Sequence, residues 1–395
     1  MTSHSVSKME YTTSQGVYRI GEEPYLLTPG PLTTAPSTKA AMLKDWGSWD
    51  EDFKAVTAEI RSRLVAMCGG GDDYDCVPMQ GSGTFSVEAA LASFIPKKDA
   101  KALILMNGAY GARSAKTLDY IGRDYITLDK GDYLPPMPAE VDALLSENPD
   151  VTHVVVVHCE TSSGILNPLK GISDVVHSRG LKLIVDSMSA FGAVPVDVAE
   201  IPFEALVSSA NKCIEGVPGF GFILAKKSAL QAAEGKSHSL SLDIHDQWAY
   251  MNKTGQWRFT PPTHTVVAFL EALRLHEAEG GVEGRLSRYA GNRDILVAGM
   301  RKMGFETLLE DEWLSPIITT FFSPNDPNFD FFRFYNEIKS RGFIIYPGKL
   351  TVADSFRIGC IGALDADVMR GVLTAVKESC ESMGVVNLGP PDGVK

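Results

Sequence analysis

An aspartate and a lysine at the ends of two apolar runs are the residues whose types and order could do chemistry. Asp186 closes the apolar run 181–185, and Lys212 follows a second run, 205–208. Strands buried in a parallel sheet are continuously apolar, so both runs are predicted to be strands. Because ligands bind at the carboxyl ends of such strands, the carboxylate and the amine are predicted to converge there.

A converging carboxylate and amine suit pyridoxal phosphate, a cofactor that has an aldehyde and a basic ring nitrogen. The amine of a lysine bonds covalently to the aldehyde, and a carboxylate keeps the ring nitrogen protonated, so that the ring accepts electrons. Each residue also has a common structural role. Most lysines are solvated surface residues, and an aspartate at a strand end often caps the next helix. The order of the pair along the chain favours the cofactor site.

Glycines and hydroxyl residues mark a predicted anion site ahead of a helix. Gly81, Ser82, Gly83 and Thr84 precede residues 85–94, which have helical character. Glycines let the backbone approach an anion, and a helix N-terminus offers free N–H groups and a favourable dipole. The same residues could instead form an ordinary helix cap, with the hydroxyl of Ser82 or Thr84 as the capping group. Beside the Asp/Lys pair, the sequence predicts a phosphate-binding turn here.

Further segments that follow predicted strands could contact a flat ring. Tyr110 lies between glycines in a predicted loop after the strand 102–106, where an aromatic side chain can stack on a planar cofactor. The polar stretch 158–164 follows the strand 154–157 and offers hydroxyl groups to the 3′-oxygen of the ring. All these segments fall at carboxyl ends of strands, where ligands of open α/β sheets bind.

Size, charge and cysteine content limit the class of protein. The chain has 395 residues, of which 44% are hydrophobic, which is enough for a large core and for more than one domain. A formal net charge of −12 without a basic block argues against nucleic acid and anionic membranes as partners. No apolar run could span a bilayer, and residues 1–10 lack the layout of a secretory signal. The cysteines show no CxxC pair and no spacing typical of zinc, so we expect free thiols, no metal and a soluble cytoplasmic protein.

Short apolar runs alternate with amphipathic stretches ahead of residue 264, which is typical of βαβ units and a mostly parallel sheet. The predicted strands are 102–106, 154–158, 181–185, 205–208 and 220–224, and a helix is predicted over 50–67. Later in the chain, helices are predicted over 264–277, 282–303, 331–341 and 366–383, with strands over 317–322 and around Ile344 and Phe356. We therefore expect an N-terminal arm (1–25), a large domain (26–265), a smaller domain (266–384) and a flexible tail (385–395).

The segments around these residues resemble the class V aminotransferases, a group of fold-type I pyridoxal-phosphate enzymes. The stretches that carry the resemblance are LLTPGPL (26–32), GSGTFSVEA (81–89), HCETSSGILNP (158–168), VDSMSAFG (185–192), SANKCIEGVPGFG (209–221), SLSLDIHDQW (239–248), WRFTPPTH (257–264) and IIYPGKLTVADSFRIGCIG (344–362). The combination of SANKCIEGVPGFG, SLSLD and YPGK is most similar to the members that use 2-aminoethylphosphonate as the amino donor and pyruvate as the acceptor.

The resemblance implies a fold and a set of site residues. The implied fold is α/β, with a large domain built on a mostly parallel seven-stranded sheet flanked by helices, and a smaller C-terminal α+β domain. Lys212 would hold the cofactor covalently, Asp186 would pair with the ring nitrogen, and Arg357 would bind the acid group of the substrate. The remaining implied contacts are the phosphate cradle of Ser82, Gly83 and Thr84 with Asn211 assisting, Tyr110 on the ring face, Thr161 at the 3′-oxygen, and Thr260 or Thr263 from the neighbouring subunit of a homodimer.

The implied reaction is the transamination of 2-aminoethylphosphonate with pyruvate, giving phosphonoacetaldehyde and L-alanine in a step of phosphonate degradation. Two alternatives stay open. The first is a class V aminotransferase for another donor, of the alanine–glyoxylate or serine–pyruvate type, which trials with different amino donors would discriminate. The second is a non-catalytic binding protein on the same fold. Mixed with pyridoxal phosphate, such a protein would not form the yellow adduct with Lys212 that the Lys212→Ala variant loses.

Overall fold

The computed structural model describes residues 10–13, 16–19, 23–348, 353–391 and 393. Parts of three predictions lie outside the described residues. They are 1–9, 14–15 and 20–22 of the predicted arm, the stretch 349–352 that includes Lys349 of the YPGK segment, and 392 and 394–395 of the predicted tail.

The described elements follow the alternation that the sequence predicts. In chain order, the strands are β1 (Glu10–Thr13), β2 (Gly16–Arg19), β3 (Tyr25–Leu26), β4 (Tyr74–Gln80), β5 (Lys101–Met106), β6 (Asp124–Asp129), β7 (His153–Val157), β8 (Cys159–Glu160), β9 (Ile165–Leu166), β10 (Lys182–Asp186), β11 (Ala205–Ser209), β12 (Phe220–Lys226), β13 (Ile318–Phe322), β14 (Phe343–Ile344), β15 (Tyr346–Pro347) and β16 (Ser355–Gly359). The α-helices are α1 (Pro36–Ala40), α2 (Glu51–Met67), α3 (Gly83–Phe94), α4 (Ala109–Ile121), α5 (Pro138–Glu147), α6 (Leu169–Ser178), α7 (Lys227–Ala232), α8 (Ile244–Thr254), α9 (Thr263–Ala278), α10 (Gly281–Met303), α11 (Phe331–Ser340) and α12 (Ala366–Met383).

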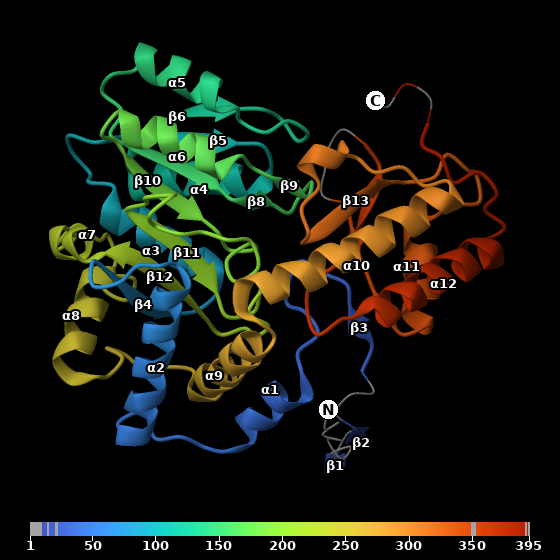
Figure 1. The fold of residues 1–395 in the computed structure, drawn as a ribbon, viewed down its shortest axis with the longest axis horizontal. Coiled ribbons are helices and arrows are strands. Elements are labelled where there is room, and N and C mark those ends of the chain that lie inside the picture. The colour runs from blue at the N-terminus through green and yellow to red at the C-terminus, as the bar shows by residue number, and fades with distance from the viewer. Residues whose placement is uncertain (1–9, 14–15, 20–22, 349–352, 392, 394–395) are drawn as a thin grey trace.

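A seven-stranded sheet forms the middle of the large unit (Figure 1). Its order is β4-β12-β11-β10-β7-β5-β6, and its pairs are parallel except those of β12, which runs antiparallel to β11 and β4. The prediction of a mostly parallel seven-stranded sheet is therefore confirmed. The individually predicted strands are the interior ones. The apolar-run criterion missed the two edge strands, because β6 is largely exposed or half-buried and β4 contains Pro78.

Helices cover both faces of this sheet, because alternate residues of a strand point to opposite faces. On one face, Leu103, Val154 and Leu183 share a core with side chains of α2, α5, α6 and α9. On the other face, Ile104 and Val155 share a core with side chains of α3, α4, α7 and α8. The large unit is thus a three-layer α/β structure, as the resemblance implied.

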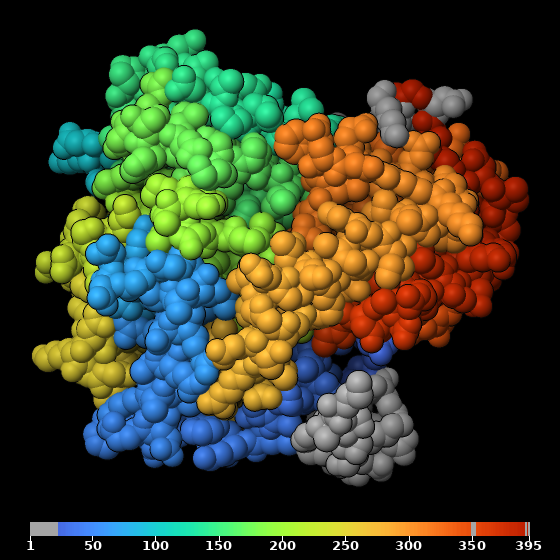
Figure 2. Space-filling model, viewed as in Figure 1, coloured from blue at the N-terminus to red at the C-terminus, as the bar shows by residue number. Residues whose placement is uncertain are grey.

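The C-terminal unit packs α10, α11 and α12 against the antiparallel sheet β13-β16-β15. Strand β3 pairs with β14 in this unit, and Leu27 lies in its core. Phe269 of α9 packs instead in the core of the large sheet. In the space-filling view, the orange residues of α9 and α10 run between the large unit and the red C-terminal helices (Figure 2). The predicted domain bounds 26–265 and 266–384 stay a prediction.

The described residues include neither a membrane-crossing helix nor a disulfide. None of their helices combines the length and the apolar character that crossing a bilayer requires. All six cysteines are buried free thiols in this structure. Burial raises the pKa of Cys159 to about 12, so this thiol stays protonated and unreactive.

Candidate active site

The Asp/Lys pair lies at the carboxyl edge of the large sheet, where the sequence places it. Asp186 is the last residue of β10, and Lys212 follows β11 after a turn. The two strands are parallel neighbours. Asp186 is 7% exposed, and Lys212 is half-buried. The carboxylate and the amine are close enough for each charge to shift the pKa of the other.

Burial moves both groups toward their neutral forms. It raises the pKa of Asp186 to about 6, and the backbone N–H of Met188, which donates to Oδ1 at 3.0 Å, opposes this shift. Burial also lowers the pKa of Lys212 to about 8, against the charge of Asp186. A buried carboxylate of this kind suits a cationic partner, and a neutral amine is both a nucleophile and a base.

The turn at the start of the large unit holds the amine of Lys212. Its Nζ donates to the carbonyl oxygens of Pro29 at 2.8 Å and Gly30 at 3.4 Å. Gly30 has φ +111°, and a Cβ there would lie 2.6 Å from Cδ and 2.8 Å from Nζ of the lysine. Only glycine suits both the backbone angle and the close approach. In the sequence, this segment carries part of the family resemblance, and its contact with Lys212 appears only in the fold.

The predicted phosphate turn lies between β4 and α3. Ser82 is the N-cap residue of α3, but its hydroxyl makes no capping hydrogen bond. Ser82 and Thr84 are exposed, whereas Gly83 is buried, and a Cβ at Gly83 would lie 2.2 Å from Sδ of Met188. The structure therefore does not support Ser82 as a capping residue. The N-terminus of α3 and the hydroxyls of Ser82 and Thr84 are left able to bind an anion.

One pocket gathers side chains from helices α3 and α4 and from the carboxyl end of β10. It is lined by Thr84, Val87, Tyr110, Arg113, Ser114, Thr117, Asp186 and Met188. The prediction of a loop at Tyr110 is wrong, because Gly108 caps α4 directly after β5 and Tyr110 lies in the first turn of this helix. The ring nevertheless lies at the strand end, in the same pocket as Asp186.

Arg113 is a charged residue of this pocket that sequence reasoning missed. Its guanidinium carbon lies 4.9 Å from the centre of the Tyr110 ring, and Nη1 donates to Oγ1 of Thr84 at 3.4 Å. Its positive charge, after the larger effect of burial, also lowers the pKa of Lys212. Residues three apart on a helix lie on one face. Had the sequence predicted a helix at 109–121, Arg113 would have been expected beside Tyr110.

Arg357 is buried in β16, with 3% of its surface exposed. Its Nη1 donates to the carbonyl oxygen of Thr161 at 2.7 Å, and Nε donates to that of Pro347 at 3.0 Å. Among the described residues, these hydrogen-bond partners are carbonyl oxygens rather than carboxylates. Burial lowers the pKa of Arg357, and the nearby Tyr110 and Glu160 oppose this shift, so the guanidinium lies beside the pocket. A buried guanidinium held in this way suits a bound anion.

Glu160 is a second residue that sequence reasoning missed. Its carboxylate is fully buried, and Oε2 accepts from the backbone N–H groups of Tyr110 at 2.9 Å and Gly111 at 3.3 Å. Oε1 accepts from the hydroxyl of Ser162 at 2.5 Å. Glu160 therefore ties the first turn of α4 to the segment of Thr161, whose carbonyl holds Arg357. A carboxylate at a helix N-terminus also meets a favourable dipole.

The remaining predicted residues lie at the edge of this arrangement. Asn211 precedes Lys212, and its Oδ1 accepts from the hydroxyl of Ser209 at 3.0 Å. Thr260 is exposed, and its carbonyl accepts from Nε2 of Gln80 at 3.3 Å. Thr263 is the first residue of α9. Neither threonine lines the pocket of its own chain, and their role toward a neighbouring subunit stays a prediction.

A larger cavity, of about 1030 Å³, opens between the loop after β6 and the segment 308–322. It shares Gly108 and Ala109 with the start of α4, but no predicted site residue lines it. Chemistry depends on converging functional groups rather than on volume, so the smaller pocket is the candidate active site.

The residues that line this pocket, together with the neighbouring Lys212, fit pyridoxal phosphate. The amine of Lys212 suits its aldehyde, the buried Asp186 suits a protonated ring nitrogen, and the N-terminus of α3 suits its phosphate. Gly30 and Gly83 lie where a Cβ would collide with Lys212 and Met188, so the backbone approaches both side chains closely.

Comparison with known proteins settles the family. The model of the class V aminotransferase family matches residues 38–329, which is more than half of the chain. The chain belongs to the class V aminotransferase family. Pyridoxal phosphate is therefore confirmed as the cofactor, and the chain as a pyridoxal-phosphate-dependent aminotransferase.

Individual members of the family are similar over nearly the whole chain. A 2-aminoethylphosphonate–pyruvate transaminase of Rhizobium meliloti (strain 1021) is 70% identical over 370 residues, which cover 93% of this chain and 96% of that protein. A 2-aminoethylphosphonate–pyruvate transaminase 1 of Paraburkholderia xenovorans (strain LB400) is 64% identical, with 93% and 95% covered.

Solved structures show the same fold. Pyridoxamine–pyruvate aminotransferase of Mesorhizobium loti has a TM-score of 0.84 at 23% identity, with 95% of each chain covered. Alanine–glyoxylate aminotransferase of Nostoc sp. has a TM-score of 0.84 at 24% identity, with 90% of this chain and 95% of that chain covered. The prediction of a fold-type I enzyme is confirmed.

Proposed function

We propose that this class V aminotransferase transfers the amino group of 2-aminoethylphosphonate to pyruvate, giving phosphonoacetaldehyde and L-alanine in a step of phosphonate degradation. The observation that carries the proposal is 70% identity, over 93% of the chain, to a transaminase named for these two substrates. The site supports it, because a buried arginine for the acid group lies beside the pocket that holds Asp186.

Asp186 in this pocket and the neighbouring Lys212 divide the work of the reaction. Bound pyridoxal phosphate supplies an electron-accepting ring next to the carbon that carries the amino group. Asp186 holds a proton at the ring nitrogen. Lys212 takes a proton from the reacting carbon and returns one later, and its pKa of about 8 leaves much of the amine neutral at mildly alkaline pH.

Arg357 binds the acid group of each substrate in turn. A planar guanidinium can bind a phosphonate or a carboxylate with two parallel hydrogen bonds, and burial strengthens both. For the other groups we propose that Ser82, Gly83 and Thr84 bind the cofactor phosphate with help from Asn211, that Tyr110 stacks on the ring, and that Thr161 reaches the 3′-oxygen.

We also propose a homodimer with shared active sites, located in the cytoplasm. The exposed position of Thr260 leaves it accessible to a neighbouring phosphate site, which Thr260 or Thr263 would complete. Buried free thiols are compatible with a reducing compartment.

An assay of amino donors tests the proposed substrates. With pyruvate as the acceptor, 2-aminoethylphosphonate is expected to yield phosphonoacetaldehyde and alanine in equal amounts, and serine is expected to react much more slowly. The aldehyde and the alanine are each measured directly. Faster reaction of serine with pyruvate, or of alanine with glyoxylate, would assign the chain to another class V activity.

The substitution Arg357→Lys is expected to raise the Michaelis constants for both substrates, because one guanidinium serves both half-reactions. Loss of a bidentate charge-assisted contact costs about 1.5–3 kcal/mol, or roughly 10–100-fold in kcat/KM. Each half-reaction is measured separately by stopped-flow absorbance. Arg341→Lys, on the surface end of α11, is the matched control. An effect on one substrate alone would mean that two separate anion sites exist.

A further inference from the structure

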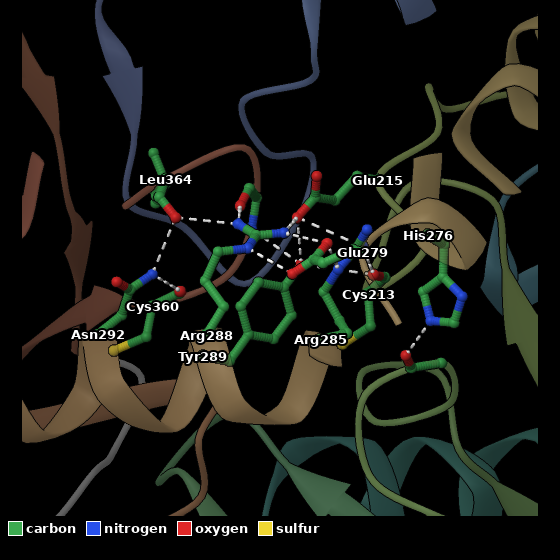
Figure 3. A network of polar contacts seen from close by, with 12 residues as sticks. Cys213, Glu215, His276, Glu279, Arg285, Arg288, Tyr289, Asn292, Cys360 and Leu364 are labelled. Atoms are coloured by element: carbon green, nitrogen blue, oxygen red, sulfur yellow. Dashed lines mark hydrogen bonds and ion pairs between the residues drawn. The ribbon is translucent and has the colours of Figure 1, made fainter. Parts of the chain in front are cut away.

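A cluster of buried and half-buried charged side chains joins the loop after Lys212 to helix α10 (Figure 3). We call Glu215, Glu279, Arg285, Arg288 and Tyr289 the α10 cluster. Arg285 is 1% exposed and Tyr289 is fully buried. The carboxylates of Glu215 and Glu279 balance the guanidinium groups of Arg285 and Arg288, so the buried charges compensate one another.

On one side, the α10 cluster holds the backbone that follows Lys212. Oε1 of Glu215 accepts from the hydroxyl of Tyr289 at 2.6 Å and pairs with Nη2 of Arg288 at 2.7 Å. The backbone N–H of Glu215 donates to the carbonyl oxygen of Lys212 at 2.7 Å. Arg285 donates to the carbonyl oxygen of the next residue, Cys213.

Glu215 adopts a backbone conformation that requires such support. Its φ is +65°, in the left-handed region that residues other than glycine rarely adopt. Strain of this kind persists only where surrounding contacts hold it, and it is concentrated near functional sites. The bonds from α10 supply that hold directly beside Lys212.

On the other side, the same helix holds the loop after the strand of Arg357. Nη1 of Arg288 donates to the carbonyl oxygens of Gly362 at 2.5 Å and Leu364 at 2.9 Å. The hydroxyl of Tyr289 accepts from the backbone N–H of Gly362 at 3.2 Å. Arg288 and Tyr289 therefore contact both the loop after Lys212 and the loop after Arg357.

The chemistry of the cluster favours a geometric role over a stabilising one. Burying ions costs desolvation that their attraction barely offsets, so apolar residues could stabilise the same contact as well. Directional hydrogen bonds, in contrast, specify one arrangement of the groups that they join. Burial, and then the charge of Glu215, raise the pKa of Tyr289 well above its usual value, so its hydroxyl remains a donor.

We propose that the α10 cluster sets the spacing between Lys212 and Arg357 and thereby the length of the substrate that the site accepts. Its members are positioning residues, since they act through Lys212 and Arg357. The inference rests on the proposed function, which assigns the reacting carbon to Lys212 and the substrate anion to Arg357. A misplacement of about 1 Å can cost roughly 10²-fold in rate, so small shifts between these anchors change which substrate fits.

The test compares substrates that differ by one methylene between the amine and the phosphonate. Tyr289→Phe removes only the hydroxyl that contacts both loops. The ratio of kcat/KM for 2-aminoethylphosphonate to that for 3-aminopropylphosphonate is expected to fall at least about fivefold in this variant, given the steep dependence of rate on alignment. Glu215→Gln should lower the ratio as well, and the double variant should show less than the sum of the two effects.

The matched control is Tyr125→Phe, which lies away from the cluster. It also removes a hydroxyl that donates to a carboxylate, in this case Oδ1 of Asp119 at 3.0 Å. It is expected to keep the wild-type ratio. A lower melting temperature with an unchanged ratio in both cluster variants would show that the cluster is structural and would overturn the proposal.

Amide hydrogen exchange separates this inference from the proposed function. In Tyr289→Phe, exchange should become faster in residues 213–216 and 360–364, while the central strands keep their protection. This measurement needs no substrate. Unchanged exchange in both loops overturns the inference even if the enzyme uses 2-aminoethylphosphonate. A wild-type enzyme inactive on that donor overturns the proposed function, while the exchange result still decides whether the cluster holds the two loops.

Discussion

Lys212→Ala is expected to abolish transamination, lowering kcat by roughly 10⁴-fold or more, because we propose that the amine supplies both the covalent hold on the cofactor and the proton transfer. The fold should survive. Burial lowers the pKa of this amine to about 8, which means that the folded protein disfavours a charge at this position. Replacing the lysine with an uncharged alanine therefore removes no favourable charge interaction that the fold needs. Turnover is measured by alanine formation, and folding by circular dichroism.

Chemical labelling checks the same assignment without turnover. Borohydride reduction of the wild-type holoenzyme should fix the mass of the cofactor on the peptide that contains Lys212, and the alanine variant should carry no label. Lys101→Ala, which loses a surface ion pair with Asp150, is the control and should behave like the wild type. A label on another lysine, or substantial turnover by the variant, would contradict the assignment.

Asp186→Asn is expected to lower the rate and to stabilise the cofactor-free protein. An amide cannot keep the ring nitrogen protonated by ion pairing, so we expect a fall of at least about 100-fold in kcat, or about 2.7 kcal/mol. Near-normal turnover would show that another group holds this proton. The opposite sign of the two effects is typical of residues retained for function at the expense of stability.

The stability effect depends on pH in a defined direction. Burial raises the pKa of Asp186 in the folded protein to about 6, above the value of about 3.9 for an unfolded chain. The folded state therefore binds this proton more tightly than the unfolded state does. The stability that the bound proton contributes is lost as pH rises from about 4 to about 6. Above that range the buried charge costs about 3 kcal/mol, and asparagine avoids this cost.

Thermal unfolding of the cofactor-free proteins measures this difference. The variant should melt at a higher temperature than the wild type above pH 6, and the gap should close near pH 4. Asp174→Asn, at an exposed ion pair with Lys170, should show no such pH-dependent gap. An Asp186→Asn protein less stable than the wild type at pH 8 would mean that the carboxylate has a compensating partner in the folded chain.

The parts of this protein that the sequence could predict are those with a local cause. The interior strands have apolar middles because both of their faces are covered, as residues 183–185 of β10 and 205–207 of β11 show. The edge strand β6 escapes the same criterion, since solvent on one side permits polar residues. The convergence of Asp186 and Lys212 at one edge of the sheet was likewise predictable, because both residues follow apolar runs that form neighbouring parallel strands.

The contacts that hold these groups in place were not predictable, because they join residues far apart in sequence. Gly30 lies against Lys212, and Glu160 accepts a hydrogen bond from the backbone of the first turn of α4. Arg288 donates hydrogen bonds to both Glu215 and Gly362. Composition and periodicity report which face of an element is buried, and they say nothing about which distant polar group it meets there. That choice arises only when the sheet and α10 pack, since hydrogen bonds and ion pairs act over a few ångströms.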